Sequence, residues 1–309
     1  MDYALNDDER MLVDALEQLA EKYGQAPSQH VGPWYDGTPL RQELIANGFL
    51  RIAREEGFGP LQAALVVDVI ARQTAVAEVA ASALIVPQLF AEDIEGPIAL
   101  IDASDGCWDK PVRFLSVARH ALIDLGDDVV LLPLQPADVE VIDAFVAYPT
   151  GRLTRGDLGG GRRLGADAVE ILRQWWRVAL AVEMSATMLA ALDKTVAYLK
   201  ERHAFGRPIG SFQSVQHRLA VCAQQAHSAR WLALRAADTR DPADAAIALA
   251  YAQEAGNTLY WDTHQFTGAI GLTFEYPLHY WTLRLRVMQS DFGGALATAA
   301  TAAEMVCGL

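Results

Sequence analysis

The spacing of apolar residues predicts helices at both ends of the chain and strands in the middle. Residues 5–23 place apolar side chains at helical spacing, with Asn6 or Asp7 available as the first cap. Residues 39–48 form a second predicted helix that starts at a proline and ends at a glycine, and the Ala-rich stretch 60–92 has room for two more. The N-terminal third is therefore predicted to be helical.

After residue 97 the pattern changes to short apolar runs separated by turn residues. The turns contain Asp-Gly, Gly-Asp-Asp, Pro-Ala-Asp and Pro-Thr-Gly, which favour strands. Residues 156–161 are Gly-rich and are interpreted as a linker, because neither a GxGxxG nor a Walker pattern accompanies them. The predicted strands lie within the runs 97–102, 112–118, 120–125, 128–134 and 139–147.

From residue 166 onward the pattern is helical again. The first predicted helix, residues 166–205, is long, free of proline and apolar around most of its circumference, as an interior helix of a bundle is. Four further helices are predicted at 212–238, 241–266, 277–289 and 292–306.

Together these elements predict a mainly α fold, α+β overall, with three parts. The first is an N-terminal helical domain over residues 1–95. The second is a reduced β module with its linker over 96–160. The third is a C-terminal, four-helix-type bundle over 161–309.

Composition and charge narrow the partners that we expect. Hydrophobic residues make up 52% of the chain, which excludes a disordered protein. The 25 basic and 39 acidic residues give a net charge of −14, which disfavours nucleic acid. No apolar run approaches the roughly 20 residues that span a bilayer. The acidic, polar N-terminus lacks the features of a signal peptide, so the expected location is the cytoplasm.

The cysteines and histidines give no sign of a disulfide framework or a metal site. Cys107, Cys222 and Cys307 are widely spaced and contain no CxxC pattern. The histidines are not spaced as metal ligands, and no Ser/His/Asp set stands out. We therefore predict no metal.

Two segments of the C-terminal half combine residues suited to binding a dinucleotide. The first runs from Glu201 to Ile209 (Glu-Arg-His-Ala-Phe-Gly-Arg-Pro-Ile) and continues as Phe-Gln-Ser-Val-Gln-His from Phe212. It gathers cations within an acidic chain, and an Arg offers planar donors suited to diphosphate oxygens. The second runs from His264 to His279 and includes Gly268, which allows a backbone to approach a ligand closely.

These two segments resemble the C-terminal bundle of the acyl-CoA dehydrogenase family, and residues 5–22 resemble its first helix. The resemblance implies FAD as the cofactor. It implies that five residues contact the pyrophosphate and adenine half of FAD, some of them across a subunit interface. These residues are Arg202, Phe205, Gln213, Gln265 and Gly268.

The same resemblance implies that Glu275 is the catalytic base. Removing the α-proton of an acyl-CoA thioester requires such a base, while the flavin accepts the β-hydride. Glu275 lies two residues before Pro277, so we predict that it sits in the first turn of a helix, whose N-terminus stabilises a carboxylate. An N-terminal helix charge without chemistry is the alternative reading. By resemblance, the electron acceptor is electron-transfer flavoprotein.

The middle of the chain departs from the family pattern. The β module is short and lacks the Thr-Glu-x-x-x-Gly-Ser-Asp loop and the Lys-x-Trp/Tyr strand that face the flavin ring. A glycine of the second segment is replaced by Ala269. The later Glu-Gly-Thr/Ser segment is replaced by Ser290-Asp291-Phe292-Gly293-Gly294. Some bacterial members, including ones that act on steroid side-chain CoA esters, are α2β2 assemblies with incomplete subunits. The departures favour a partner chain of that kind.

Three hypotheses follow from the sequence. In the first, the chain is a catalytic subunit of a heterotetrameric acyl-CoA dehydrogenase of lipid or steroid side-chain catabolism, with Glu275 as base. In the second, it is a non-catalytic structural subunit that completes the FAD site of a partner. In the third, it is a helical scaffold that merely descends from the family. The presence of Arg202 and Gln213 disfavours the third.

Overall fold

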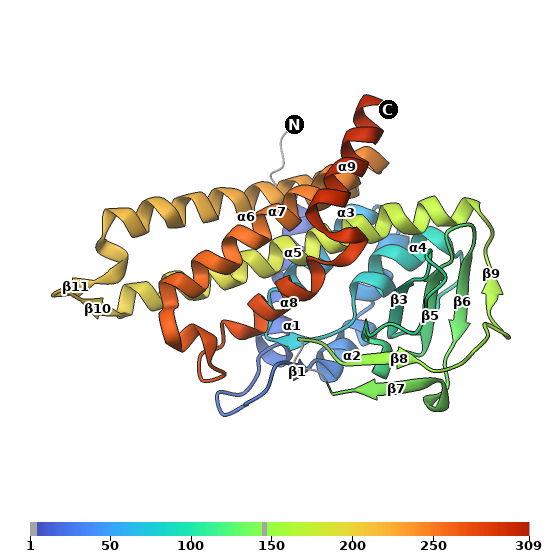
Figure 1. The fold of residues 1–309 in the computed structure, drawn as a ribbon, viewed down its shortest axis with the longest axis horizontal. Coiled ribbons are helices and arrows are strands. Elements are labelled where there is room, and N and C mark those ends of the chain that lie inside the picture. The colour runs from blue at the N-terminus through green and yellow to red at the C-terminus, as the bar shows by residue number, and fades with distance from the viewer. Residues whose placement is uncertain (1–4, 144–146, 309) are drawn as a thin grey trace.

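The computed structural model describes residues 5–143 and 147–308 and has the predicted mainly α fold. Figure 1 shows a bundle of long helices, with the sheets beside one end of it and the N-terminal helices alongside. A small hairpin projects from the opposite end of the bundle. Within the described residues, we find no helix that combines the length and the apolar character needed to cross a membrane.

The N-terminal part contains four α-helices and a short parallel pair of strands, β1 (Tyr35–Asp36) and β2 (Ala75–Val76). Asn6 is the residue that caps the first helix, since its side chain accepts a hydrogen bond from the Glu9 N–H at 2.9 Å and Glu9 returns one. The stretch predicted as two helices contains α3 and, after β2, a π-helical turn that leads into α4. The helices are α1 (Asp7–Tyr23), α2 (Thr38–Ala46), α3 (Pro60–Ala71) and α4 (Val86–Leu89).

The middle part forms two small sheets. One has the strand order β3-β5-β6-β9 and the other β4-β8-β7. β3 and β5 are parallel, and the other pairs are antiparallel. Residues 144–146 of the last predicted run lie outside the described part of the chain. The strands are β3 (Ile98–Asp102), β4 (Val112–Arg113), β5 (His120–Asp124), β6 (Val129–Pro133), β7 (Val139–Ile142), β8 (Thr150–Leu153) and β9 (Arg162–Arg163).

The sequence pattern missed the last two of these strands. β8 contains Gly151 and no continuous apolar run, and β9 is a pair of arginines beyond the predicted linker. Both strands join their sheets through backbone hydrogen bonds: β8 pairs with β4 and β7, and β9 with β6. Their side chains therefore show little of the apolar pattern by which strands are predicted from a sequence.

The C-terminal part is a bundle built around α5, most of whose side chains are buried. Small alanines of α6 and α7 pack against it. α5 ends at Glu201, earlier than the long apolar pattern predicts, because the chain turns there into a hairpin. The helices are α5 (Asp167–Glu201), α6 (Gln213–Thr239), α7 (Pro242–Thr267), α8 (His279–Met288) and α9 (Gly294–Cys307), and the hairpin strands are β10 (His203–Ala204) and β11 (Arg207–Pro208).

Buried ion pairs fasten the β module to the bundle. Arg173 of α5 donates to Asp124 of β5 at 2.6 Å, and that aspartate is 2% exposed. Arg113 of β4 donates to Glu183 of α5 at 2.8 Å. Charge pairs shielded from water depend strongly on geometry, so these contacts fix how the module lies on the helix.

Candidate functional site

The six residues that the sequence singles out lie together at one end of the bundle. The end of α5, the hairpin, the start of α6, the end of α7 and the loop before α8 meet there, and the sheets lie toward the other end (Figure 1). We call residues 201–213 and 264–276 the bundle end. All six residues are exposed. They are Arg202, Phe205, Gln213, Gln265, Gly268 and Glu275.

The hairpin displays Phe205 at its tip. Residue pairs His203–Pro208 and Ala204–Arg207 face each other, so Phe205 and Gly206 form a two-residue turn. Their φ angles, 53° and 81°, are both positive, as such a turn requires. Phe205 is 95% exposed in the single chain. A large apolar ring that is held in an unfavourable conformation and left in water is typical of a contact surface.

The cationic side chains near the hairpin differ in whether they already have a partner within the chain. Arg218 donates to Asp262 at 2.7 Å, and the Arg207 guanidinium lies 4.0 Å from the centre of the Phe212 ring. The Arg202 guanidinium is exposed and makes no hydrogen bond or ion pair with the described residues. The predicted group of cations is therefore not one binding set, and Arg202 is the member available to an external anion.

Gln265 and Gly268 stand at the end of α7. Gln265 is exposed in the last turn of the helix. Gly268 ends the helix at φ 63° and ψ −147°, a conformation that favours glycine. No neighbouring atom lies within 4 Å of the position that a Cβ would take there. The backbone at Gly268 is thus open to a molecule from outside the chain.

Glu275 lies outside the helix in which the sequence pattern placed it. α8 begins at His279 rather than at Pro277, so Glu275 is four residues ahead of it. The effect of a helix N-terminus on charge is confined to the first turn, so this helix gives Glu275 little stabilisation. The carboxylate is exposed and has no hydrogen-bond or ion-pair partner within the described residues.

A cavity of about 360 Å³ lies between the β module and the bundle. Asp102 and Arg113 of the module, Trp176 of α5, and Asp291 and Phe292 after α8 are among the residues that line it. Burial raises the pKa of Asp291 to about 6, while Arg113 opposes this rise. Asp291 is not among the residues that the motifs single out; it lies in the segment that replaces the family's Glu-Gly-Thr/Ser segment.

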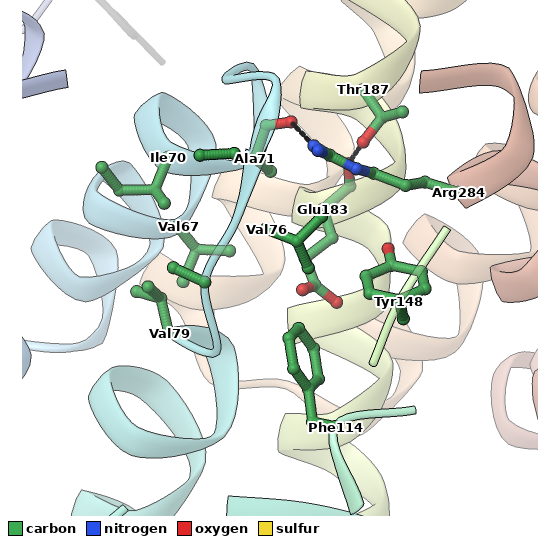
Figure 2. Close-up of a pocket in the computed structure, with 12 residues that line it drawn as sticks. Val67, Ile70, Ala71, Val76, Val79, Phe114, Tyr148, Glu183, Thr187 and Arg284 are labelled. Carbon is green, nitrogen blue, oxygen red and sulfur yellow. Dashed lines mark hydrogen bonds between the residues drawn. The ribbon is translucent and has the colours of Figure 1, made fainter. Parts of the chain in front are cut away.

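A second cavity, between the N-terminal helices and α5, is almost filled. Its volume is about 20 Å³, room for one water molecule. Figure 2 shows Val67 and Val79 on one side of it and Tyr148 on the other, with Val76 and Glu183 between them and Phe114 below. Burial raises the pKa of Tyr148 to about 12, so the phenol stays neutral.

Arg284 of α8 closes the same cavity from above (Figure 2). It is 4% exposed and donates to the carbonyl oxygens of Gln73 at 2.6 Å and Thr74 at 2.5 Å. These bonds tie α8 to the end of α3. The side chains around the cavity leave no space for a chain of methylene groups, and the Arg284 Nε–H has no hydrogen-bond partner in the described residues.

Within residues 5–143 and 147–308, no three His, Cys, Asp or Glu side chains are grouped as metal ligands. The cysteines are free: Cys222 is buried, Cys307 is exposed and Cys107 is partly buried.

Comparisons with known proteins agree with this architecture. The model of the acyl-CoA dehydrogenase C-terminal domain matches residues 165–297. The chain is 28% identical over 245 residues to acyl-CoA dehydrogenase IpdE2 of Mycolicibacterium smegmatis, covering 67% of this chain and 78% of that protein. It is 34% identical over 208 residues to acyl-CoA dehydrogenase FadE34 of Mycobacterium tuberculosis, covering 65% of this chain but only 26% of that protein.

The fold is also that of a chain in the crystal structure of the ChsE4–ChsE5 complex from Mycobacterium tuberculosis. The TM-score is 0.76 at 21% identity, and the match covers 100% of both chains. Residues 165–297 therefore form an acyl-CoA dehydrogenase C-terminal domain, and the chain as a whole has the fold of these proteins and is similar in sequence to acyl-CoA dehydrogenases over about two thirds of its length.

Proposed function

We propose that this chain is a subunit of an FAD-dependent acyl-CoA dehydrogenase and that its bundle end completes a flavin site in another chain. The observation that carries the proposal is the position of the predicted FAD contacts. They are exposed and lie away from the chain's own sheets (Figure 1). A side chain that serves the chain's own β module would point toward it.

The residues of the bundle end fit the phosphate half of FAD. Arg202 presents an unpaired guanidinium, Gly268 presents open backbone, and Phe205 presents an exposed ring. Diphosphate oxygens accept hydrogen bonds from guanidinium groups, and an adenine ring stacks on aromatic or planar groups. We assign Gln213 and Gln265 as hydrogen-bonding residues of the same site. Bound FAD would supply the hydride acceptor.

The proposed reaction is the α,β-dehydrogenation of an acyl-CoA thioester. By family resemblance, the substrate is a lipid or steroid side-chain ester and the electron acceptor is electron-transfer flavoprotein. The assembly that we propose is a heterotetramer. It is supported by the absence of the flavin-ring motifs from this sequence and by the two-chain complex among the proteins of the same fold.

A second candidate function is that of a non-catalytic subunit that only completes the partner's FAD site. The filled inner cavity, about 20 Å³, favours it, because an acyl chain would have to displace Tyr148 and the Arg113–Glu183 pair. The two candidates share the bundle end and differ in whether this chain supplies a proton acceptor.

Flavin content tests the proposal. The chain is expressed alone and together with acyl-CoA dehydrogenase chains that carry the flavin-ring motifs missing here. We expect the chain alone to be flavin-poor and the co-purified assembly to be yellow. A fully flavin-loaded, active homo-oligomer of this chain alone would contradict the heteromer.

Glu275→Gln in the co-expressed enzyme then tests the base that the sequence predicts. A loss of turnover with flavin content unchanged supports Glu275 as the base. Unchanged turnover would show that Glu275 is not the base. The test is needed because the Glu275 carboxylate is exposed.

A further inference from the structure

A third cavity, of about 510 Å³, lies on the N-terminal helices. Its walls come from α2, the 3-10 helix Phe49–Arg54, the start of α4 and residues 93–97, and these elements lie away from the hairpin of the bundle end (Figure 1). The cavity shares no lining residue with the bundle end or with the two cavities described above. Its volume lies within the range of small-molecule sites, roughly 300–1,000 Å³.

Part of the cavity lining is apolar. Ile45 of α2 lines the cavity and is 52% exposed, although it is a large aliphatic residue. Leu50, Val86 and Ile94 also line it. A ligand with an apolar body would remove these side chains from water, and that transfer favours binding.

The rest of the lining carries more positive than negative charge. Two carboxylates line the cavity, those of Asp93 and Glu95, and a third, that of Glu78, lies against one of the arginines. The arginines of the lining are Arg41, Arg51, Arg54 and Arg119. The chain as a whole has a net charge of −14, so this excess of cations is local. Such a site attracts a small anion, whereas the whole chain repels a polyanion.

Arg41 is the buried arginine of the cavity. It is 8% exposed, and its guanidinium donates to the Glu78 carbonyl oxygen and to the Ser82 hydroxyl, each at 3.0 Å. The Glu78 carboxylate, 3.4 Å from Nη2, balances its charge. These bonds use Nε and Nη2, and Nη1 makes no hydrogen bond with the described residues. The guanidinium is thus held in one position and keeps donors for an occupant, which lowers the entropy lost on binding.

The exposed arginines of the cavity are held only by exposed acids. Arg51 lies 3.1 Å from Asp93 and Arg119 lies 2.8 Å from Glu95, and all four side chains are at least 50% exposed. Ion pairs in water contribute little, so a ligand carboxylate can compete for these two guanidinium groups. Arg54 differs from them, because it donates to three backbone carbonyl groups at the end of α4 and fixes the wall of the cavity.

We propose that this cavity binds a small amphipathic carboxylate, with its apolar body against Ile45 and Leu50 and its carboxylate among the arginines. The two oxygens of a carboxylate match the planar donors of a guanidinium group. An uncharged apolar molecule would leave the cations of the site unused, and a bare anion would leave Ile45 in water. The site would work without the bundle end, so the proposal goes beyond the proposed function and does not depend on it.

Calorimetry of the full chain, alone and co-purified with a partner chain, tests the proposal. The probes are decanoate and cholate, with decanol, which lacks the carboxylate, and inorganic phosphate, which lacks the apolar body. Ile45→Asp adds an acid to the cavity, and Met11→Asp, at an exposed apolar residue of α1, is its matched control. Arg119→Gln removes a cation, with Arg10→Gln as its control. Thermal unfolding of each variant shows whether it is folded.

We expect decanoate or cholate to bind with one molecule per chain and to raise the Tm, since a ligand of the folded state stabilises it. Decanol and phosphate should bind about 10-fold more weakly or less, because each loses one half of the interaction. Ile45→Asp should weaken carboxylate binding by about 10-fold or more through repulsion between like charges. Arg119→Gln should weaken it several-fold. Met11→Asp and Arg10→Gln should bind as the wild type does.

Four results would overturn the proposal. They are no binding of either carboxylate, equally tight binding of decanol or phosphate, no difference between the cavity variants and their controls, and loss of binding in the co-purified assembly. The last result would mean that a partner chain covers the cavity. None of these results alters the flavin content of the assembly, so the proposed function is judged separately.

Discussion

The bundle end and the interior around the filled cavity use similar residue types in opposite ways. At the bundle end, Arg202 and Phe205 are exposed and make few contacts within the chain. In the interior, Arg113 is paired with Glu183 and Tyr148 is buried. An exposed cation beside an exposed ring needs a ligand or another chain to complete it, whereas a buried ion pair fills space that a ligand would need. The difference separates an exposed surface that fits the proposed contact with a second chain from an interior whose space is already filled.

The largest effect should come from breaking the interior pair. Burial lowers the pKa of Arg113, but the Glu183 carboxylate outweighs this effect and raises it above its ordinary value. Glu183→Gln leaves the guanidinium without its anion and should lower the free energy of unfolding by about 3–5 kcal/mol. Urea unfolding of the full chain, followed by circular dichroism, measures this.

Glu140→Gln is the matched control for the interior pair. Glu140 bonds to Arg152 at 2.6 Å, but both side chains are about half exposed. Its loss should cost about 0–1 kcal/mol. Equal losses in the two variants would show that the interior pair is not shielded from water, and the contrast between the two regions would fail.

The next effect concerns the bundle end. Arg202→Gln should leave the free energy of unfolding within about 0.5 kcal/mol of wild type, because the side chain has no partner in the described chain. It should weaken FAD binding by the co-purified assembly by about 10- to 100-fold, as loss of a charge-assisted hydrogen bond does. Equilibrium dialysis against FAD measures the affinity.

Arg10→Gln serves as the control for Arg202→Gln. Arg10 is also exposed, on α1, where it bonds to Asp7. FAD affinity should be unchanged in this variant. Equal affinities for both variants would mean that Arg202 does not contact the cofactor.

The pH dependence of stability tests Asp291. Its folded-state pKa, about 6, lies above the ordinary value of 3.8, so the folded chain binds the extra proton between about pH 4 and pH 6. The contribution of Asp291 to stability is therefore present below about pH 4 and is lost as the pH rises through 6. Asp291→Asn should remove this slope and raise the free energy of unfolding at pH 8 by about 1–3 kcal/mol. A slope that is unchanged in the variant would exclude Asp291 as its source.

The smallest effect is expected at the hairpin tip. Phe205→Asn replaces a ring held at φ 53° by a residue that tolerates this conformation, so the chain should gain up to about 1 kcal/mol of stability. FAD affinity of the assembly should nevertheless fall several-fold. Thermal unfolding and flavin titration check the two parts. A clear loss of stability would show that Phe205 is held by contacts within its own chain.

The sequence allowed the helices and the bundle end to be predicted because both leave local signals. Apolar periodicity fixes α1, α6 and α7 within a residue or two of their observed ends. The hairpin was not predicted, because the helical pattern continues to Phe205, four residues past the observed end of α5 at Glu201. Strand β9 could not be found in this way, because its two arginines pair only through backbone atoms with β6.

The cavity could not be predicted because it is formed by distant segments. Asp102 and Asp291 are 189 positions apart and meet only through the packing of the β module on the bundle. The available signal was the replacement of a family segment by Ser290-Asp291-Phe292-Gly293-Gly294, where consecutive glycines allow the left-handed backbone that positions the acid. Glu275 is the opposite case. It was selected because it matches a family motif, but α8 begins four residues after it, too far away to stabilise its charge.

A structure of the co-purified assembly, determined by electron microscopy with FAD bound, tests the central claim most directly. The account predicts that Arg202, Gln213 and Gln265 lie within hydrogen-bond distance of the diphosphate and adenine half of a flavin whose ring lies in another chain. A flavin held wholly by one chain, with the bundle end of this chain in solvent, would contradict it.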